Sequence, residues 1–155
     1  MSAKTWWAED FTPGLTFTTP GATITEAQIL DFAMRYDPQP FHLDKTAAEA
    51  SIYGGLIASG FQTLSTAFRL WQSMAVINPS SQGSPGMDEV LWHAPVRPND
   101  TIHCVITVTD NRRSASRPHL HIVQWVWEVF NQDGVKVMSF KGPGMYLRAP
   151  DRRDA

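Results

Sequence analysis

The sequence predicts an α+β domain in which an antiparallel sheet wraps around one long buried helix. The first observation is a run of apolar residues with helical spacing in the middle of the chain, at Ile57, Phe61, Leu64, Phe68, Trp71 and Ala75. The second is a change of pattern after residue 86, where stretches rich in Val, Ile, Trp and Phe alternate as strands do. A long helix followed by consecutive strands favours a sheet that covers the helix.

The first third of the chain predicts one strand and two helices. Residues 15–23 alternate loosely between apolar and polar side chains, as a strand does. Thr25 stands three positions before Gln28, which makes an approximate capping box at the start of a helix. Pro38 ends this helix, whose apolar face carries Ile29, Phe32, Ala33 and Tyr36. Residues 43–51 are rich in alanine and predict a second, short helix.

The second half of the chain predicts a loop and then a series of strands. We expect the central helix to end near Asn78-Pro79, before a polar loop at residues 80–86. The strands are expected at residues 90–94, 101–110, 119–131 and 135–148. Residues 150–155 predict a frayed tail.

Short motifs divide these strands and indicate how they pack. Asn99-Asp100 and Asp133-Gly134 are typical turn residues. The run Gly142-Pro143-Gly144 interrupts the last strand and predicts a bulge or bend. Trp125 and Trp127 alternate with valines and are expected to be core or interface aromatics. An open sheet edge together with apolar area on the strand that carries these tryptophans predicts self-association.

Composition points to one globular domain, residues 1–155. A chain of 155 residues with 43% hydrophobic side chains has enough material for one core. The net charge of −2 gives no electrostatic case for nucleic-acid binding. The single cysteine, Cys104, excludes an intramolecular disulfide, fits a reducing compartment and is expected to be buried. No apolar run has the length of a signal peptide or a membrane span, so we expect a cytoplasmic protein without membrane contact.

Residues 36–46 contain the strongest functional signal. Asp37 and His42 lie five positions apart, and Pro38 and Pro40 lie between them. Each proline fixes its own φ angle and pushes the preceding residue away from helical geometry. The sequence therefore predicts a stiff, non-helical surface bridge that holds an acid and an imidazole at a set distance, as proton transfer requires. Each residue taken alone is more simply a turn former or a structural histidine.

The start of the central helix is a second candidate site. Gly60 lies in the first turn, where backbone N–H groups lack intrahelical partners and carry partial positive charge. A glycine there allows a negatively charged oxygen to approach closely, although it could also serve tight packing. Ser59 is expected to satisfy a backbone donor of the helix rather than to act as a nucleophile.

These motifs resemble a known family. Tyr36-Asp37-Pro38-Gln39-Pro40-Phe41-His42-Leu43-Asp44 is similar to the hydratase signature of MaoC-like proteins, the (R)-specific enoyl-CoA hydratases and acyl dehydratases. Residues 57–60 resemble the start of that family's central helix, residues 94–100 its proline-flanked turn, and residues 130–134 its late hairpin. The chain departs from the family where Gln39 replaces an asparagine, Ser59 a histidine, and Phe68 a serine.

The resemblance implies a hot-dog fold, a two-fold homodimer with active sites between subunits, and an acyl-CoA substrate. Asp37 and His42 would be the acid/base pair that adds water to a 2-enoyl thioester or removes it from a 3-hydroxyacyl thioester. Gly60 would hold the thioester oxygen, and Ser59, Tyr53 and Phe61 would complete the oxyanion and substrate-binding site. Such chemistry needs no metal or redox cofactor, and desolvation is expected to raise the pKa of Asp37 toward neutral pH.

Two other functions and one other site remain open. A hot-dog thioesterase would direct water at the carbonyl carbon but would not need His42 at this spacing. A non-catalytic acyl-thioester-binding protein would not need Asp37 or His42. His119 and His121 share a strand face, but two histidines without a third ligand are weak support for a metal site. The aromatic residues Phe41, Tyr53, Phe61, Phe68 and Trp71 could fill the substrate tunnel and limit it to short or branched acyl groups.

Overall fold

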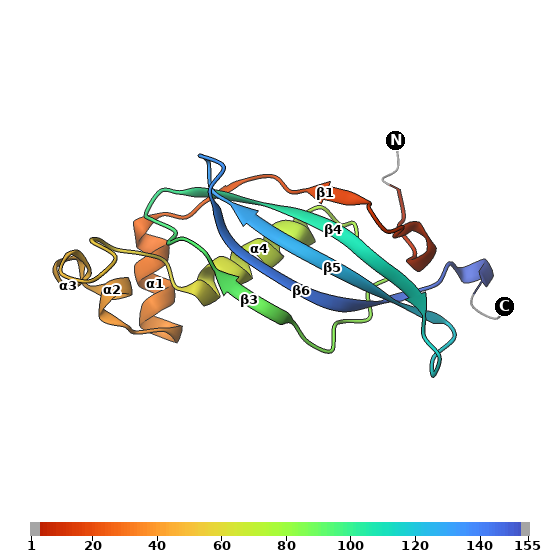
Figure 1. Cartoon of the computed structure of the whole chain (residues 1–155). Coiled ribbons are helices and arrows are strands. Elements are labelled where there is room, and N and C mark those ends of the chain that lie inside the picture. Colours follow the sequence, from red (N-terminus) through yellow and green to blue (C-terminus); the bar gives the residue numbers. More distant parts are fainter. Residues whose placement is uncertain (1–3, 153–155) are drawn as a thin grey trace.

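The strands of the second half of the chain form one antiparallel sheet that curves around the central helix (Figure 1). The computed structural model describes residues 4–152. Its elements are η1 (Ala8–Asp10), β1 (Thr16–Thr18), β2 (Ala22–Thr23), α1 (Glu26–Tyr36), α2 (Pro40–Leu43), α3 (Lys45–Glu49), α4 (Gly60–Ser73), β3 (Asp88–Trp92), β4 (Thr101–Arg113), β5 (Leu120–Phe130), β6 (Lys136–Leu147) and η2 (Pro150–Arg152).

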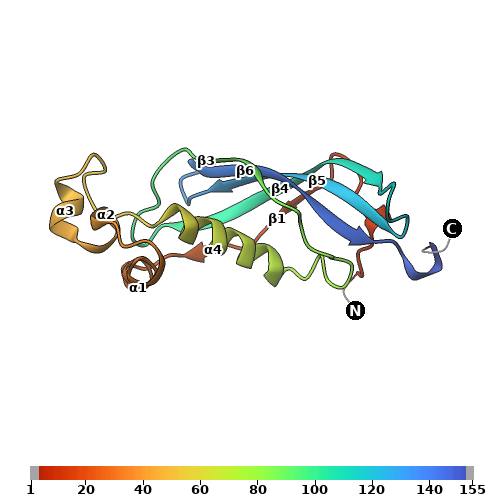
Figure 2. The same cartoon turned by 90° about the horizontal axis from the view of Figure 1, so that it is seen from below.

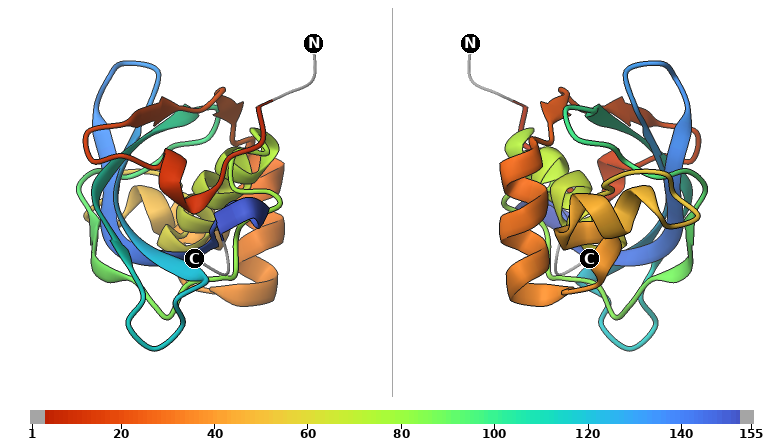
Figure 3. Two further views of the ribbon diagram at one scale, coloured as in Figure 1. Left: turned by 90° about the vertical axis from the view of Figure 1, so that its right-hand side faces the viewer. Right: turned by 90° about the vertical axis from the view of Figure 1, so that its left-hand side faces the viewer.

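The sheet has the strand order β1-β4-β5-β6-β3, and the short strand β2 also pairs with β4. Helix α4 crosses one face of this sheet (Figure 2), and α1 stands on the side away from the sheet (Figure 3). The predicted α+β class with a sheet wrapped around a long helix is confirmed. No helix within residues 4–152 combines the length and the apolar character needed to cross a bilayer.

Helix α4 is apolar on more than one side, and the apolar stripe predicted from the sequence coincides with the core face only in part. The side chains of Ala67, Leu70 and Trp71 are buried against the sheet. Of the predicted stripe, Phe61 is 62% exposed and Phe68 is 49% exposed. A period of 3.6 residues identifies an apolar face, but it does not show whether that face meets the sheet or an open cavity.

The core is built around aromatic side chains from the sheet. Trp125 on β5 lies edge-on to Phe11 and to Trp71, with ring centroids 5.3 and 5.5 Å apart. Trp127 stacks on Phe140 at 4.8 Å. Both tryptophans are therefore core residues, which is one of their two expected locations, and they do not supply exposed apolar area for self-association.

The exposed apolar area lies elsewhere. Edge strand β3 leaves Leu91 and Trp92 about half exposed, and Met87 precedes them. Phe61 and Phe68 add the exposed side of α4. An unpaired strand edge beside exposed aromatics and leucine is a surface that proteins usually cover.

The last strand was predicted to contain a bulge or a bend at its glycines, and it contains no bulge there. Gly142, Pro143 and Gly144 pair in continuous register with Trp125 and its neighbours on β5. Strand β3 pairs with β6 only as far as Lys141, so Pro143 faces a side of β6 that has no partner strand there. A proline at such an unpaired edge removes no ladder hydrogen bond.

Three further expectations can be compared with the structure. The predicted first strand is divided into β1 and β2, which pair with different parts of β4. Cys104 is buried as expected, and its burial raises the pKa of its thiol to about 12. The expected tail begins with the exposed turn η2, and residues 153–155 lie outside the described range.

Candidate active site

Asp37 and His42 are held together by a helix end and one helical turn. The N–H of Asp37 donates to the carbonyl of Ala33 at 3.0 Å, which makes Asp37 the C-cap of α1. Residues 40–43 form the short helix α2, so the expected non-helical bridge is wrong. Pro40 occupies the first position of that helix, where a proline needs no N–H and its fixed φ is already helical.

His42 is buried and its ring orientation is fixed. Its Nδ1 lies 2.8 Å from the carbonyl oxygen of Ile57, and a carbonyl oxygen only accepts. Nδ1 therefore carries the proton, and Nε2 faces Asp37 Oδ2 at 3.3 Å. In the neutral ring Nε2 offers a lone pair, whereas in the imidazolium it donates to the carboxylate. With only 4% of His42 exposed, the expected surface location is wrong for this residue.

The carboxylate of Asp37 accepts two further hydrogen bonds. Ser59 Oγ donates to Oδ2 at 2.7 Å, and Gln39 Nε2 donates to Oδ1 at 2.8 Å. Burial works to raise the pKa of Asp37, but these two hydrogen bonds and the nearby His42 outweigh burial, so the pKa lies below its ordinary value. The expectation that desolvation raises this pKa is therefore wrong.

Ser59 joins the acid to the start of α4. Its hydroxyl accepts from the N–H of Phe61 at 3.2 Å, as the expected N-cap does, while it donates to Asp37. The side chain is fully buried. The sequence predicted the cap, but the hydrogen bond to Asp37 depends on a contact across 22 positions that no local motif reveals.

Gly60 is the first residue of α4, so its N–H has no intrahelical partner. The indole ring of Trp92 lies against this glycine, and a Cβ built there would overlap the ring. Gly60 is therefore a position of close packing as well as a possible oxyanion donor. The sequence analysis did not identify Trp92, although it directly precedes His93 and the proline-flanked turn.

A cavity of about 420 Å³ opens beside these groups. Five of the six predicted site residues line it, namely Asp37, His42, Gly60, Tyr53 and Phe61. Ser59 lies behind the wall and acts through Asp37. The wall also contains four polar or aromatic residues that the sequence analysis did not place there, Gln39, Thr63, Trp92 and His93.

Arg97 holds the loop before α4 in place by hydrogen bonds to backbone carbonyls. Its guanidinium donates to the carbonyl of Tyr53 and, at 3.3 Å, to that of Gly55. The ring of Tyr53 packs on Phe41 with centroids 5.1 Å apart. The proline-flanked turn thus fixes a wall of the cavity, which the sequence analysis had treated as a marker of family resemblance only.

The other histidines lie in different surroundings. His93 Nε2 is 2.7 Å from Ser139 Oγ, and His121 Nδ1 is 2.8 Å from Asn111 Oδ1. Residues 4–152 contain no group of three or more His, Cys, Asp or Glu side chains placed to hold a metal ion.

Comparison with known proteins shows that the chain is similar to one family. The family model described as "MaoC like domain" matches residues 10–125. The protein YdeM of Bacillus subtilis, which is uncharacterized, is 31% identical over 129 residues, or 83% of this chain and 90% of that protein. The crystal structure of a MaoC-like dehydratase from Rhodospirillum rubrum is 36% identical, with a TM-score of 0.85 over 94% of this chain and 99% of its own.

A more distant structure supports the fold alone. The R-hydratase PhaJ1 from Pseudomonas aeruginosa, solved without ligand, is 20% identical, with a TM-score of 0.70 over 92% of this chain and 86% of its own.

The hydrogen bond from Ser59 generates a prediction about acidity. Ser59→Ala should raise the pKa of Asp37, because the ionised carboxylate loses a donor that favours the charged form. Carbon NMR titration of the aspartate carboxyl groups measures this shift. Ser65→Ala, on the same helix but away from Asp37, is the control and should leave the titration unchanged. An unchanged Asp37 titration in Ser59→Ala would contradict the assigned hydrogen bond.

Proposed function

The chain belongs to the MaoC-like domain family and has the hot-dog fold, and from this premise we propose that it is a hydro-lyase acting on an acyl thioester. The substrate would be a 2-enoyl thioester in hydration and a 3-hydroxyacyl thioester in dehydration, with coenzyme A as the expected thiol. One observation supports this proposal most. The 3.3 Å contact between Asp37 and His42 borders the same cavity as the N–H of Gly60 at the start of α4.

Hydration would begin with water held between Asp37 and Nε2 of His42. The β carbon of the enoyl thioester is electrophilic because the conjugated carbonyl withdraws electrons from it. Ionised Asp37 takes a proton from the water while the water oxygen bonds to the β carbon. The imidazolium form of His42 gives its Nε2 proton to the α carbon, and the proton on Asp37 then returns to Nε2. General acid–base catalysis of this kind contributes about 10²–10⁴-fold.

Charge that develops on the thioester oxygen would be held by the N–H of Gly60. A donor of this type contributes about 3 to 4 kcal/mol in comparable oxyanion sites. The partial positive charge of the helix start adds to this effect. The depressed pKa of Asp37 keeps it ionised at neutral pH, and its Oδ2 lies 3.3 Å from Nε2 of His42, where it can accept a hydrogen bond from the imidazolium form.

The geometry favours hydration over the thioesterase alternative. A thioesterase needs an acid that directs water at the carbonyl carbon. Here the buried imidazole is anchored by Ile57 and turned toward the carboxylate, an arrangement suited to deprotonating water at the β carbon and protonating the adjacent α carbon. A protein that only binds acyl thioesters would have no use for this buried pair.

Assembly is proposed to be a two-fold homodimer. The exposed residues Trp92 on edge strand β3 and Phe61 on α4 border the catalytic cavity, and Leu91, next to Trp92, is also exposed. A second copy that covers this surface would also exclude water from the cleft. Closed C2 pairs are the commonest homo-oligomers.

Removal of either proton-transfer group tests the mechanism. Asp37→Asn and His42→Ala should each lower kcat for hydration of but-2-enoyl-CoA by about 10²–10⁴-fold. Because both groups act on one water, the double variant should be little worse than either single variant. Loss of conjugated enoyl absorbance measures the rate. Asp110→Asn and His119→Ala, which replace exposed side chains, are controls, and wild-type turnover in Asp37→Asn or His42→Ala would remove the mechanism.

Variants at Gly60 and Trp92 separate the oxyanion role from packing. Gly60→Ala should lower kcat by about tenfold or more, because its methyl group blocks approach to the N–H and also collides with Trp92. Trp92→Ala removes that collision. We expect Gly60→Ala/Trp92→Ala to remain at least about tenfold slower than Trp92→Ala alone. If the double variant instead equals Trp92→Ala, the glycine serves packing and the oxyanion donor lies elsewhere.

The assembly proposal predicts a mass of about twice the chain mass of 17.3 kDa in light scattering at micromolar concentration. Leu91→Glu should shift the protein toward the monomer because it places a charge in the proposed interface. Ile52→Glu is the matched control, because Ile52 is 94% exposed in the turn after α3. A monomeric wild-type chain would contradict the dimer.

A further inference from the structure

The catalytic cavity has a second unpaired donor beside the backbone N–H of Gly60, the Nε1–H of Trp92. Both residues line this cavity. Neither of these two N–H groups donates to another group within residues 4–152. The side chain of Trp92 is half exposed, so its N–H remains accessible from the cavity. The indole therefore has a donor available for a ligand.

Most other side-chain donors on this wall already have partners. Gln39, His42 and Thr63 each donate to an oxygen of the protein. His93 contacts a serine hydroxyl through its Nε2. The hydroxyl of Tyr53 has no hydrogen-bond partner within residues 4–152. Tyr53 is therefore the side-chain donor that competes with the indole.

The ring edge that carries the indole N–H lies beside Gly60. A Cβ built on Gly60 would lie 2.4 Å from both Nε1 and Cε2 of Trp92, and 2.9 Å from Cζ2. Because standard bond lengths put the nitrogen of Gly60 about 2.5 Å from the same point, the two donor nitrogens are at most about 5 Å apart. An oxygen accepts an N–H hydrogen bond at about 2.9 Å, so donors within about 5.8 Å of each other can share one oxygen. The separation therefore allows one oxygen to accept from both.

Strand β3 and helix α4 fix the place of this indole. The backbone of Trp92 pairs with Met138 on β6, and the next N–H, of His93, donates to the carbonyl of Val137 at 2.9 Å. The ring packs edge-on to Phe61, with centroids 6.2 Å apart. A donor that is in place before the reaction needs no reorganisation when charge develops.

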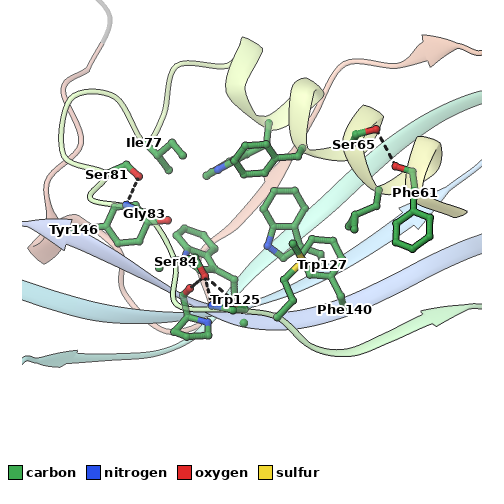
Figure 4. Close-up of a pocket in the computed structure, with 18 of the residues that line it drawn as sticks. Phe61, Ser65, Ile77, Ser81, Gly83, Ser84, Trp125, Trp127, Phe140 and Tyr146 are labelled. Atoms are coloured by element: carbon green, nitrogen blue, oxygen red, sulfur yellow. Dashed lines mark hydrogen bonds between the residues drawn. The ribbon is translucent and has the colours of Figure 1, made fainter. Parts of the chain in front are cut away.

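Phe61 lines both the catalytic cavity and a second cavity of about 660 Å³ (Figure 4). Phe68 and Trp71, which with Phe61 were expected to fill the substrate tunnel, line the second cavity and leave it open. Its wall is mostly apolar, no charged side chain of the described residues lines it, and Ser65 and Ser84 donate to backbone carbonyls (Figure 4). An oxygen that becomes negative is therefore better held in the catalytic cavity, at the positive start of α4.

We propose that the Nε1–H of Trp92 is a second oxyanion donor, which binds the thioester oxygen together with the N–H of Gly60. The inference rests on the proposed hydro-lyase function. When the water oxygen bonds to the β carbon, the electron pair of the carbon–carbon double bond moves toward the carbonyl, and negative charge develops on the thioester oxygen. Both donors hold this charge until the α carbon takes its proton from His42 and the carbonyl forms again. Trp92 is then a catalytic residue and not only the packing partner of Gly60.

Infrared spectroscopy of a bound thioester tests this donor apart from catalysis. Butyryl-CoA, isotope-labelled at the carbonyl carbon, cannot be hydrated, and each hydrogen bond to its carbonyl oxygen lowers the C=O stretching frequency. Trp92→Phe removes the N–H and keeps an aromatic ring. Benzothienylalanine in place of Trp92 keeps the bicyclic shape with sulfur where the N–H stood, so it leaves no room for a replacing water.

Both replacements should raise the C=O frequency of bound butyryl-CoA above its wild-type value. Tyr53→Phe is the matched control, because it removes the competing hydroxyl and keeps the ring, and it should leave this frequency unchanged. Either replacement of Trp92 suffices if the other fails to fold.

Kinetics with but-2-enoyl-CoA provide a second readout. Both replacements of Trp92 should lower kcat by about tenfold or more and change KM by less than about threefold, because the hydrogen bond strengthens mainly in the transition state. A purely structural role of the ring would leave kcat unchanged in the benzothienylalanine protein, which preserves the packing on Gly60.

Two outcomes would overturn the proposal. The first is a wild-type C=O frequency in the benzothienylalanine protein with butyryl-CoA bound. The second is a frequency that rises in Tyr53→Phe alone, which would assign the second donor to Tyr53. Failure of the proposed function is distinct: the wild-type protein would leave but-2-enoyl-CoA unhydrated, while the C=O frequency of bound butyryl-CoA would still depend on Trp92.

Discussion

The hydroxyl of Ser59 makes the interaction on which the candidate site depends. It accepts from the N–H of Phe61 and donates to the carboxylate of Asp37, so one buried group ties the start of α4 to the end of α1. The acid and the helix start belong to separate elements, with α2, α3 and residues 50–59 between them along the chain. His42 completes the arrangement from the other side, because its Nδ1–H is held by the carbonyl of Ile57, two residues before Ser59.

Helix α4 packs into the core on one side and faces open cavities on another. One side, with Ala67 and Trp71, packs on the sheet and excludes water. Another side presents Phe61 and Phe68 to space that the chain does not fill. A helix that is apolar on more than one side is costly in a monomer unless a ligand or another subunit covers it. The same helix therefore provides core side chains, the candidate oxyanion donor Gly60 and part of the wall of a cavity of about 660 Å³.

Local signals in the sequence predicted much of the fold and part of the site. The Thr25–Gln28 capping box and the antiparallel strands were confirmed because each depends on neighbouring residues. The spacing of Asp37 and His42 predicted their proximity, which the structure bears out at 3.3 Å. The position of Trp92 on Gly60 could not be predicted in this way, because it depends on where edge strand β3 meets α4. The prediction for the pKa of Asp37 was wrong for a similar reason. That pKa depends on the hydrogen bond from Ser59, which lies 22 positions away in the sequence.

The depressed pKa of Asp37 has a consequence for the division of proton transfer. A carboxylate that is well supplied with hydrogen bonds is a weak base toward water, so it cannot provide most of the driving force by itself. In the proposed step at the α carbon the imidazolium form of His42 supplies the proton, and its Nε2 lies 3.3 Å from this carboxylate, so the two opposite charges attract each other. Exclusion of bulk water would strengthen this electrostatic coupling, because the effective dielectric constant falls. Trp92 is placed to contribute to that exclusion, since its half-exposed ring borders the cleft and would be covered in a dimer that forms through β3. On this argument, proton transfer and assembly are coupled through one side chain at the edge of the sheet.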